Sequence, residues 1–394
     1  MFQTAPIEAT TQSELTAEIS SRLKVALETH LQQVYAPEEK KSLRLFSATE
    51  TADLLGVTAA FLRKCHSDGS LPEPDVNKNG RRFYTGQDIS KARDVLEKTS
   101  RTPGKYLPGR RANDRLQVIQ LMNFKGGSAK STSAIHLCHY LALAGYKTLA
   151  IDLDPQGSMT GFFGIHTELE KDEPSIYDAI KYDDPMPMSE CIARTYFPNL
   201  DLAPARLILS EFETETAVNA GRGISFFDRL TSAIQSVEAD YDVVIIDSPP
   251  SLGFLTLAGL YAATSVLVPM TPSMLDLAST QQFLDMTSAY LEVIEDTGLH
   301  VAHDFFSFLI TRDDPSDIPS QQIVSLMRAL FQDRVLANTA LRSTAIADAA
   351  MLKMSIYEVS RSDMTRSTYD RARNSMDGVG SEVSSMIQRA WGRG

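Results

Sequence analysis

The segment 123–132, Asn-Phe-Lys-Gly-Gly-Ser-Ala-Lys-Ser-Thr, has the residue types of a phosphate-binding loop. It follows an apolar run and precedes a helix-length stretch, which is the setting that such a loop needs. Gly126 and Gly127 allow successive backbone N–H groups to converge on one anion, and the positive end of the following helix adds to the attraction. The side chains expected at a nucleoside triphosphate are Lys130 at the β- and γ-phosphates, Ser131 at Mg²⁺ and Thr132 at the α-phosphate.

Three aspartates end two later apolar runs and supply acidic groups for a bound metal ion. Asp152 and Asp154 end the run 148–153, and positions two apart on a strand face the same side. Asp247 ends the run 243–247 as in a Walker B strand, where the carboxylate holds a water of Mg²⁺. At the carboxyl ends of parallel strands, all three would point toward a nucleotide crevice. The alternative for Asp152 and Asp154 is a pair of solvated carboxylates at a strand end.

The alternation of short apolar runs with helix-length stretches predicts the scaffold that positions these groups. Such a pattern is typical of a parallel sheet covered on both faces, and right-handed crossovers make it doubly wound. We expect an α/β fold with a doubly wound, mostly parallel sheet. The expected strands are 117–122, 148–153, 200–203, 243–247, 265–269 and 305–311, and the expected helices include 132–144, 225–239 and 277–294.

The part of the chain before residue 116 has a different pattern. Helix, tight turn, helix and basic hairpin predict a winged helix-turn-helix, with Phe61 and Leu62 in its core. The expected elements are a helix capped by Ser47, a turn at Gly56, a helix capped by Thr58, a hairpin at 79–80 and a helix from Gln87.

Residues 11–35 predict one amphipathic helix, because apolar residues recur at spacings of three and four. Such a helix must bury its apolar stripe, either on its own chain or against a second copy, and both readings stay open. The expected domains are 1–41 for this helix, 42–105 for the winged helix, 106–115 for a linker and 116–394 for the nucleotide-binding domain.

The phosphate loop departs from the ordinary Walker A, because Phe124 and Ala129 occupy its outer glycine positions. Lys-Gly-Gly-x-x-Lys-Ser, beginning at Lys125, resembles the deviant Walker A of the ParA/MinD ATPases. The resemblance implies that Lys125 reaches across a dimer interface to phosphates bound by the partner subunit. Ala129 replaces the family's usual glycine, which is tolerable if its φ is negative. The implied binding residues of the loop are Lys125, Gly126, Gly127, Ser128, Ala129, Lys130, Ser131 and Thr132.

Later segments extend the resemblance. The block 152–157, Asp-Leu-Asp-Pro-Gln-Gly, resembles the family's switch I, and 248–253 resembles its switch II. The resemblance implies that Asp154 orients or polarises the attacking water. Pro269 lies in a segment similar to the nucleotide-side loop, and Thr311 and Arg312 end the strand where the family contacts adenine. The implied catalytic residues are Lys125, Lys130 and Asp154, and the implied metal-site residues are Ser131, Asp152 and Asp247.

The winged module has its own resemblance, because Gly-Arg-Arg-Phe-Tyr at 80–84 is similar to the wing of MerR-type proteins. There the second helix enters the major groove and wing arginines contact phosphates. The implied DNA contacts are Thr58, Arg63, Lys64, His66, Lys78, Arg81 and Arg82. Related partition ATPases hold nonspecific DNA with basic residues near the C-terminus, which suggests Arg361, Arg366, Arg371 and Arg373, although a solvated helix face is an equal alternative.

Charge and composition narrow the class of protein. The net charge is −12, yet residues 40–111 hold 15 basic and 8 acidic residues, which is a hint of polyanion binding by that part. The 43% apolar and 22% charged content excludes a disordered or collagen-like chain. Three widely spaced cysteines favour a reducing cytosol. The sequence shows neither a secretory signal nor an apolar run of about 18 residues.

Together the motifs resemble the large ParA-type partition ATPases with an N-terminal DNA-binding domain, above all the RepA class of repABC replicons. The resemblance implies a slow ATPase that uses ATP and Mg²⁺, dimerises, and is stimulated by a ParB-like partner. It implies specific operator DNA on the winged helix, autoregulation, nonspecific DNA on the ATP-bound dimer, and a cytoplasmic, nucleoid-associated location without membrane contact. A MinD-like membrane-cycling ATPase would need an amphipathic C-terminal helix, for which 386–392 is too short. A transcriptional regulator that uses the fold as a nucleotide sensor is the remaining alternative.

Overall fold

The computed structural model describes residues 11–34, 41–76, 80–165, 173–222, 224–296, 298 and 301–393. The chain divides into two compact units, 1–41 and 42–394. In the first unit, the predicted amphipathic helix is confirmed as α1 (Gln12–Val34). Three residues of its apolar stripe, Leu15, Ile19 and Leu23, are exposed to solvent.

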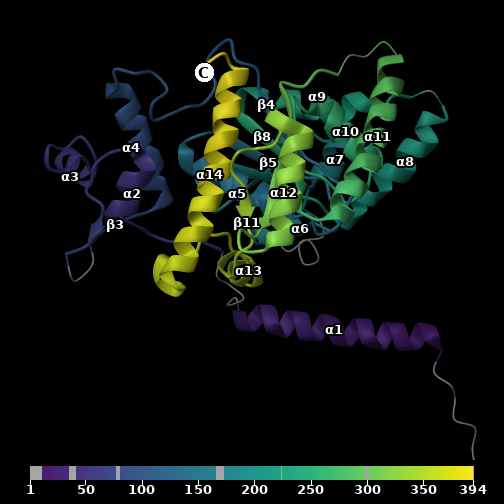
Figure 1. The fold of residues 1–394 in the computed structure, drawn as a ribbon, viewed down its shortest axis with the longest axis horizontal. Coiled ribbons are helices and arrows are strands. Elements are labelled where there is room, and N and C mark those ends of the chain that lie inside the picture. The colour runs from purple at the N-terminus through teal and green to yellow at the C-terminus, as the bar shows by residue number, and fades with distance from the viewer. Residues whose placement is uncertain are drawn as a thin grey trace, which may run out of the picture. The chain divides into compact units, whose positions relative to one another are not determined.

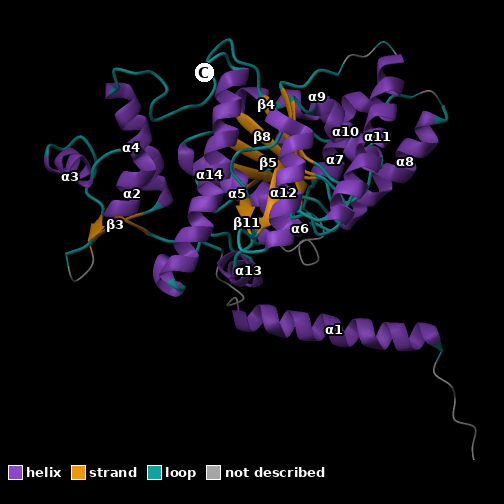
Figure 2. Ribbon diagram, viewed as in Figure 1, coloured by secondary structure: helices purple, strands orange, loops and turns teal. Residues whose placement is uncertain are grey.

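A sheet forms the centre of the second unit (Figure 2), and among the described residues it has eight strands in the order β11-β10-β9-β4-β8-β5-β7-β6. Neighbouring strands run parallel except for the antiparallel pair β6 and β7. The six predicted strands are therefore confirmed, and the two short edge strands β6 and β11 were not predicted. The strands are β4 (Gln117–Leu121), β5 (Thr148–Asp152), β6 (Ala193–Arg194), β7 (Leu200–Ala203), β8 (Val243–Asp247), β9 (Ser265–Met270), β10 (Phe305–Asp313) and β11 (Ala340–Leu341).

Helices cover both faces of this sheet (Figure 1), which confirms the doubly wound α/β fold. On one face α5 (Lys130–Ala144) and α14 (Arg366–Ala390) pack over Ile119 and Leu121 of β4. On the other face Val118 and Met122 meet α9 (Phe227–Ser236), α10 (Phe254–Ala262), α11 (Met274–Asp296) and α12 (Ile318–Phe331). The smaller helices are α6 (Ser158–Phe162), α7 (Ile176–Ile180), α8 (Glu211–Ala220) and α13 (Thr344–Met351). Among the described helices, none combines the length and the apolar character needed to cross a bilayer.

Residues 42–99 form the predicted sequence of helix, turn, helix and hairpin. Ser47, Thr58 and Thr85 cap the three helices through their side chains, and Gly56 ends the first helix in the left-handed conformation at φ 64°. Leu62 is buried as expected, but Phe61 is 40% exposed, because it lies on the outer side of the second helix. The elements are β1 (Phe46–Ser47), α2 (Ala48–Leu55), α3 (Ala59–Ser67), β2 (Asp75–Val76), β3 (Arg82–Tyr84) and α4 (Gly86–Thr99), with β3 pairing antiparallel to β1 and β2.

The segment 106–115, expected to be a linker, is fixed by hydrogen bonds and ion pairs. The Glu97 carboxylate accepts the backbone N–H groups of Tyr106 and Leu107 at 2.8 and 3.2 Å. The Arg110 guanidinium donates to Glu238 Oε1 at 3.0 Å, and Asp114 pairs with Arg393. The segment is therefore a strap on the body of the second unit, and the domain boundaries at 105 and 116 stay predictions.

Candidate nucleotide site

The phosphate loop joins β4 to α5 and is supported by two neighbouring strands. The Asn123 amide oxygen accepts the Lys125 N–H at 3.0 Å, and its Nδ2 donates to the Pro269 carbonyl at the end of β9, at 2.8 Å. The Thr311 hydroxyl on β10 donates to the Ser128 carbonyl at 3.0 Å. Pro269 and Thr311 are both buried and so lie behind the loop.

The outer side of the loop is open. Gly126 and Gly127 are exposed, and an added Cβ at either one would meet nothing within 4 Å. Gly127 has φ 82°, a conformation that glycine adopts without strain. The loop therefore presents backbone N–H groups around a space that an anion can enter.

Ala129 differs from the expectation. Its φ is 65° and its ψ is 32°, in the left-handed region, so the negative φ that would make alanine tolerable is not adopted. The Cβ approaches the following carbonyl oxygen in this conformation, which is why glycine is the usual residue there. The loop keeps its shape with a strained alanine directly before the first turn of α5.

Lys130 opens α5 and is buried at the centre of the site. Burial lowers the pKa of its ammonium group, while the charges of Asp247 and Asp154 oppose that change. Ser131 and Thr132 follow in the first turn and are half-buried. The phosphate loop thus places one cation and two hydroxyl groups at the start of a helix.

Two buried carboxylates end neighbouring strands at this end of the sheet. Asp152 ends β5 and Asp247 ends β8, and their Cα atoms are partners in the strand register. Burial raises the pKa of Asp152 to about 6, against hydrogen bonds from Thr160 and from the N–H of Asp154. Burial also raises the pKa of Asp247 well above its usual range, and the neighbouring Asp152 charge adds to the effect.

The two aspartates differ in their partners. Asp152 Oδ2 accepts the Thr160 N–H and hydroxyl at 2.9 and 2.8 Å. Neither oxygen of Asp247 has a hydrogen bond of good geometry among the residues that the structure describes, although the Ser131 hydroxyl and the Lys130 charge lie near enough to lower its pKa. A buried carboxylate held so weakly is costly unless a further cation balances it. The donor set therefore fits a hard, oxygen-binding cation such as Mg²⁺ next to Asp247.

Asp154 lies at the edge of the site. Asp154 is half-buried, and its Oδ1 accepts the N–H of Gln156 at 3.0 Å. Asp154 acts electrostatically on Lys130 and Asp247. The structure therefore gathers the predicted Lys130, Asp152, Asp154 and Asp247 at one end of the sheet.

The ammonium group of Lys125 is directed toward α11 and not toward Lys130 and the aspartates. This group forms an ion pair with Asp276 in the first turn of α11, within the same chain. Asp276 was missed by sequence reasoning, because a pattern such as Ser273-x-x-Asp276 predicts a helix start but not a distant partner.

A cavity of about 1100 Å³ extends from the loop past Ala129 and Thr132. Thr311 and Arg312 line it on the side of β10, and Arg312 is exposed and adopts φ 51°. The space suits the nucleoside end of a ligand whose phosphates occupy the loop. Pro269 does not line this cavity, and the neighbouring Thr271 and Pro272 do.

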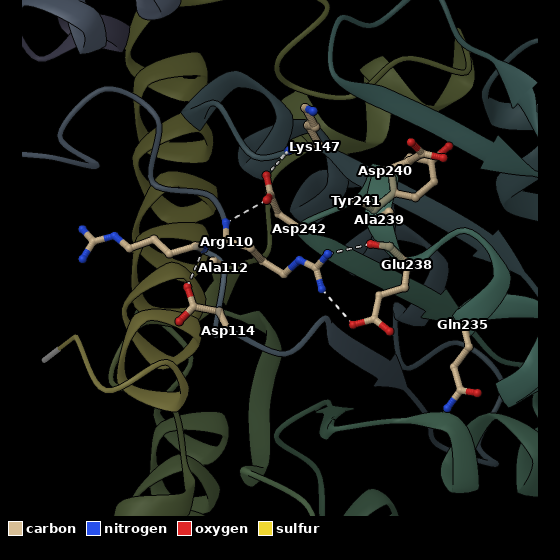
Figure 3. A pocket seen from close by; sticks show the side chains of 11 residues that line it. Arg110, Ala112, Asp114, Lys147, Gln235, Glu238, Ala239, Asp240, Tyr241 and Asp242 are labelled. Carbon is tan, nitrogen blue, oxygen red and sulfur yellow. Dashed lines mark hydrogen bonds and ion pairs between the residues drawn. The ribbon is translucent and has the colours of Figure 1, made fainter.

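A second pocket, of about 630 Å³, lies at the opposite, amino ends of the strands (Figure 3). In this pocket the Asp242 carboxylate accepts the backbone N–H groups of Arg110 and Lys147 at 2.7 and 2.8 Å, and the Arg110 guanidinium pairs with Glu238 at 3.0 Å. The pocket belongs to the strap 106–115 and contains none of the predicted nucleotide residues.

We call residues 42–99 the winged module. Its predicted DNA contacts differ in exposure: some are exposed, one is buried and one is paired with an acidic residue. Arg63 and Lys64 on α3 and Thr58 at its start are exposed. His66 is buried, and its Nε2 is hydrogen-bonded to the Tyr84 hydroxyl at 2.9 Å, so it contributes to the interior of the module. Arg81 is exposed, Arg82 pairs with Glu73 at 3.3 Å, and Lys78 lies outside the described residues.

The C-terminal arginines do not form one free patch. Arg361 pairs with Asp370, and Arg373 pairs with Asp377 at 3.0 Å while lying over the Tyr357 ring. Arg371 donates to the Arg342 carbonyl at 2.9 Å and lines the nucleotide-side cavity. A groove of about 1280 Å³ is shared by the wing and the C-terminal segment, and its lining includes Arg81, Arg361, Arg366 and Arg373.

Known proteins resemble this chain in sequence and in fold. A family model described as an AAA domain matches residues 116–297. The putative replication protein A of Sinorhizobium fredii is 44% identical to this chain over 368 residues. The match covers 92% of this chain and 90% of the relative. Protein SopA of Escherichia coli is 34% identical over 276 residues, covering 67% of this chain and 68% of SopA.

Among solved structures, one described as a partition protein has a TM-score of 0.62 at 17% identity. It covers 97% of this chain and 100% of its own, so it shares the fold. The match to the replication protein extends over most of both chains and includes the segment with the deviant phosphate loop. The chain belongs to the family of ParA-type partition ATPases, within the RepA group of repABC replicons.

Proposed function

We propose that this chain hydrolyses ATP with Mg²⁺ at the phosphate loop and uses the reaction in plasmid partition. The observation that carries the proposal is the cluster of the buried Asp247 carboxylate, the Ser131 hydroxyl and the Lys130 ammonium group beside the open glycine loop. A buried carboxylate with few donors favours a cation, and an open glycine loop with backbone N–H groups favours an anion. ATP with Mg²⁺ supplies both charges.

The residues of the site have separate tasks in this proposal. Lys130 and the backbone of 126–131 bind the β- and γ-phosphates, and Ser131 with Asp247 would hold Mg²⁺, supported by Asp152. The metal ion, when bound, neutralises charge on the phosphoryl oxygens. Asp154, at the edge of the crevice, orients the attacking water. Thr311 and Arg312 would lie near the nucleoside.

We infer a homodimer from the resemblance of the Lys125 motif to the deviant Walker A, in which this lysine serves a second protomer, so that the dimer reports the nucleotide state. In the single chain the Lys125 ammonium group pairs with Asp276 instead. The exposed stripe of α1 offers a further contact between copies. Hydrolysis would be slow alone and stimulated by a ParB-like partner.

The winged module is proposed to bind operator DNA and to autoregulate the protein's own operon. Arg63, Lys64, Arg81 and Arg82 are the basic candidates that are not in the interior of the module. Nonspecific DNA would bind the ATP-bound dimer through Arg366 and Arg371, which are exposed. These activities correspond to a cytoplasmic, nucleoid-associated protein.

Two substitutions test the catalytic proposal. Lys130→Ala should abolish ATP binding in calorimetry, because the buried cation at the phosphates is lost. Asp154→Ala should retain binding and lose phosphate release. Asp183→Ala, at an exposed acidic residue, is the matched control. Normal hydrolysis by Asp154→Ala would show that this residue does not position the water.

One observation favours the alternative of a transcriptional regulator with a nucleotide sensor. Arg361 and Arg373 pair with acidic groups of their own chain, which reduces the charge available for nonspecific DNA. A sensor would bind operator DNA but show neither partner-stimulated hydrolysis nor ATP-dependent binding to nonspecific DNA. Phosphate release with and without a ParB-like protein and DNA separates the two functions.

A further inference from the structure

The side chain of Lys125 turns away from the phosphate loop to which its backbone belongs. Its backbone N–H is fixed by Asn123, but its ammonium group reaches Asp276 on α11. The Asp276 side chain is 3% exposed and that of Lys125 is 35% exposed. The pair therefore consists of a buried anion and a cation with access to solvent.

Asp276 is held rigidly by the connection between β9 and α11. Its Oδ2 accepts the Thr271 N–H at 3.1 Å and also the Thr271 hydroxyl, and its Oδ1 accepts the Ser273 hydroxyl at 3.0 Å. The Ser273 hydroxyl in turn accepts the Asp276 N–H at 3.1 Å. Because the carboxylate is fixed and the lysine stem is flexible, Lys125 is the group that moves when the pair breaks.

We propose that Asp276 is a positioning residue that holds Lys125 within its own protomer until the phosphates of a second protomer compete for it. The inference rests on the proposed function of Lys125 at the partner's nucleotide. Leaving a buried carboxylate without its cation is costly, so Lys125 departs only for a strong anionic site. A triphosphate offers one more phosphate group than a diphosphate. ATP bound to a second protomer should therefore break the ion pair between Lys125 and Asp276, whereas ADP should not.

Asp276→Asn tests this difference between ATP and ADP, because asparagine keeps the size and one acceptor oxygen but removes the charge. Dimer formation is followed by analytical ultracentrifugation against the concentration of a nonhydrolysable ATP analogue. The variant loses the charged partner of the hydrogen bond between Lys125 and Asp276. Because such a bond is strong, the half-maximal concentration of the ATP analogue should fall at least about tenfold. ADP should also begin to support dimers. Asp285→Asn, at an exposed aspartate of the same helix, should leave both curves unchanged.

Lys125→Ala distinguishes failure of this inference from failure of the proposed function. If Lys125→Ala dimerises as the wild type does, the lysine does not serve the partner and the proposed function is wrong at that point. If Lys125→Ala loses the dimer but Asp276→Asn gives the wild-type curve, only the holding role of Asp276 is overturned.

Ser273→Ala provides a second variant in case Asp276→Asn does not fold. It removes one donor to the carboxylate, which makes Asp276 depend more on Lys125. The half-maximal analogue concentration should then rise at least about threefold, opposite in sign to Asp276→Asn. A thermal melt without nucleotide separates this shift from a loss of the helix cap. An unchanged or lower concentration would contradict the proposal.

Discussion

Ala129→Gly tests the geometry of the phosphate loop, because Ala129 adopts φ 65° and ψ 32° directly before α5. A residue other than glycine in this conformation costs about 1–2 kcal/mol. Glycine relieves that cost, but it also gives the unfolded chain more freedom, which opposes the gain by about 0.4–1 kcal/mol. The expected net stabilisation is about 0.5–1 kcal/mol.

Urea unfolding of the nucleotide-free protein measures this difference. The midpoint of Ala129→Gly should rise at an unchanged slope, which is the signature of a stability change. Ala217→Gly, at an exposed position inside α8, is the matched control and should lower stability by about 1 kcal/mol. ATP binding should persist, because the backbone N–H groups of the loop are retained. A midpoint of Ala129→Gly at or below that of the wild type would refute a strained alanine in the loop.

Three further changes test other parts of the structure. Asp247→Asn should stabilise the nucleotide-free protein by about 1–2 kcal/mol while abolishing Mg²⁺-dependent ATP binding, since it removes a buried charge whose oxygens have no hydrogen bond of good geometry among the described residues. Because burial raises the folded-state pKa of Asp247, its contribution to stability is present at acid pH and is lost as pH rises through that pKa, so the advantage of the variant should be larger at pH 8 than at pH 5 in urea titrations. Arg93→Met should cost about 2–4 kcal/mol in thermal unfolding, since the buried guanidinium donates to the carbonyls of three segments, and an unchanged melting temperature would contradict that role. Joint replacement of Arg81 and Arg82 by alanine should weaken operator binding and reduce the slope of affinity against salt by up to about 2, and equal footprinting titrations would rule out the wing as a phosphate contact.

The parts of the fold that depend on local pattern were predictable. β5 and β8 are short apolar runs that end in aspartate, and such runs are buried wherever a parallel sheet forms. The helix caps at Ser47 and Thr58 follow from side chains that bond their own backbone. The two-residue strands β6 and β11 were missed, because two residues carry no periodic pattern.

The parts that depend on contacts between distant segments were not predictable. Lys125 and Asp276 are 151 positions apart, and nothing local in either segment indicates the pair. His66 lies on a basic helix, but its side chain is buried and is hydrogen-bonded to the Tyr84 hydroxyl of β3. The left-handed backbone of Ala129 is set by the turn from β4 into α5, whereas alanine by itself favours negative φ.

Helix α5 contacts both the phosphate loop, proposed to bind ATP, and residues 42–99, proposed to bind DNA. Lys130 at its start belongs to the phosphate loop, and the Leu143 carbonyl in its last turn accepts the Arg93 guanidinium of the winged module at 3.0 Å. On its side, His136 Nδ1 donates to the Thr132 carbonyl at 2.7 Å, and Nε2 accepts the N–H of Ile356 at 3.3 Å. Burial lowers the pKa of His136 to about 4, so the ring is neutral at pH 7 and one nitrogen can donate while the other accepts.

A displacement of α5 at the phosphate loop would therefore reach the winged module through Arg93 and the segment before α14 through His136. Side chains in a close-packed interior leave little room for independent adjustment, so these contacts would move with the helix. Arg93 joins three segments through one side chain, because its three acceptors lie on α2, on α5 and at Tyr106 in the strap. Any effect of bound nucleotide on operator affinity should for this reason depend more on Arg93 than on Arg63, Arg81 and Arg82, the arginines proposed to contact DNA.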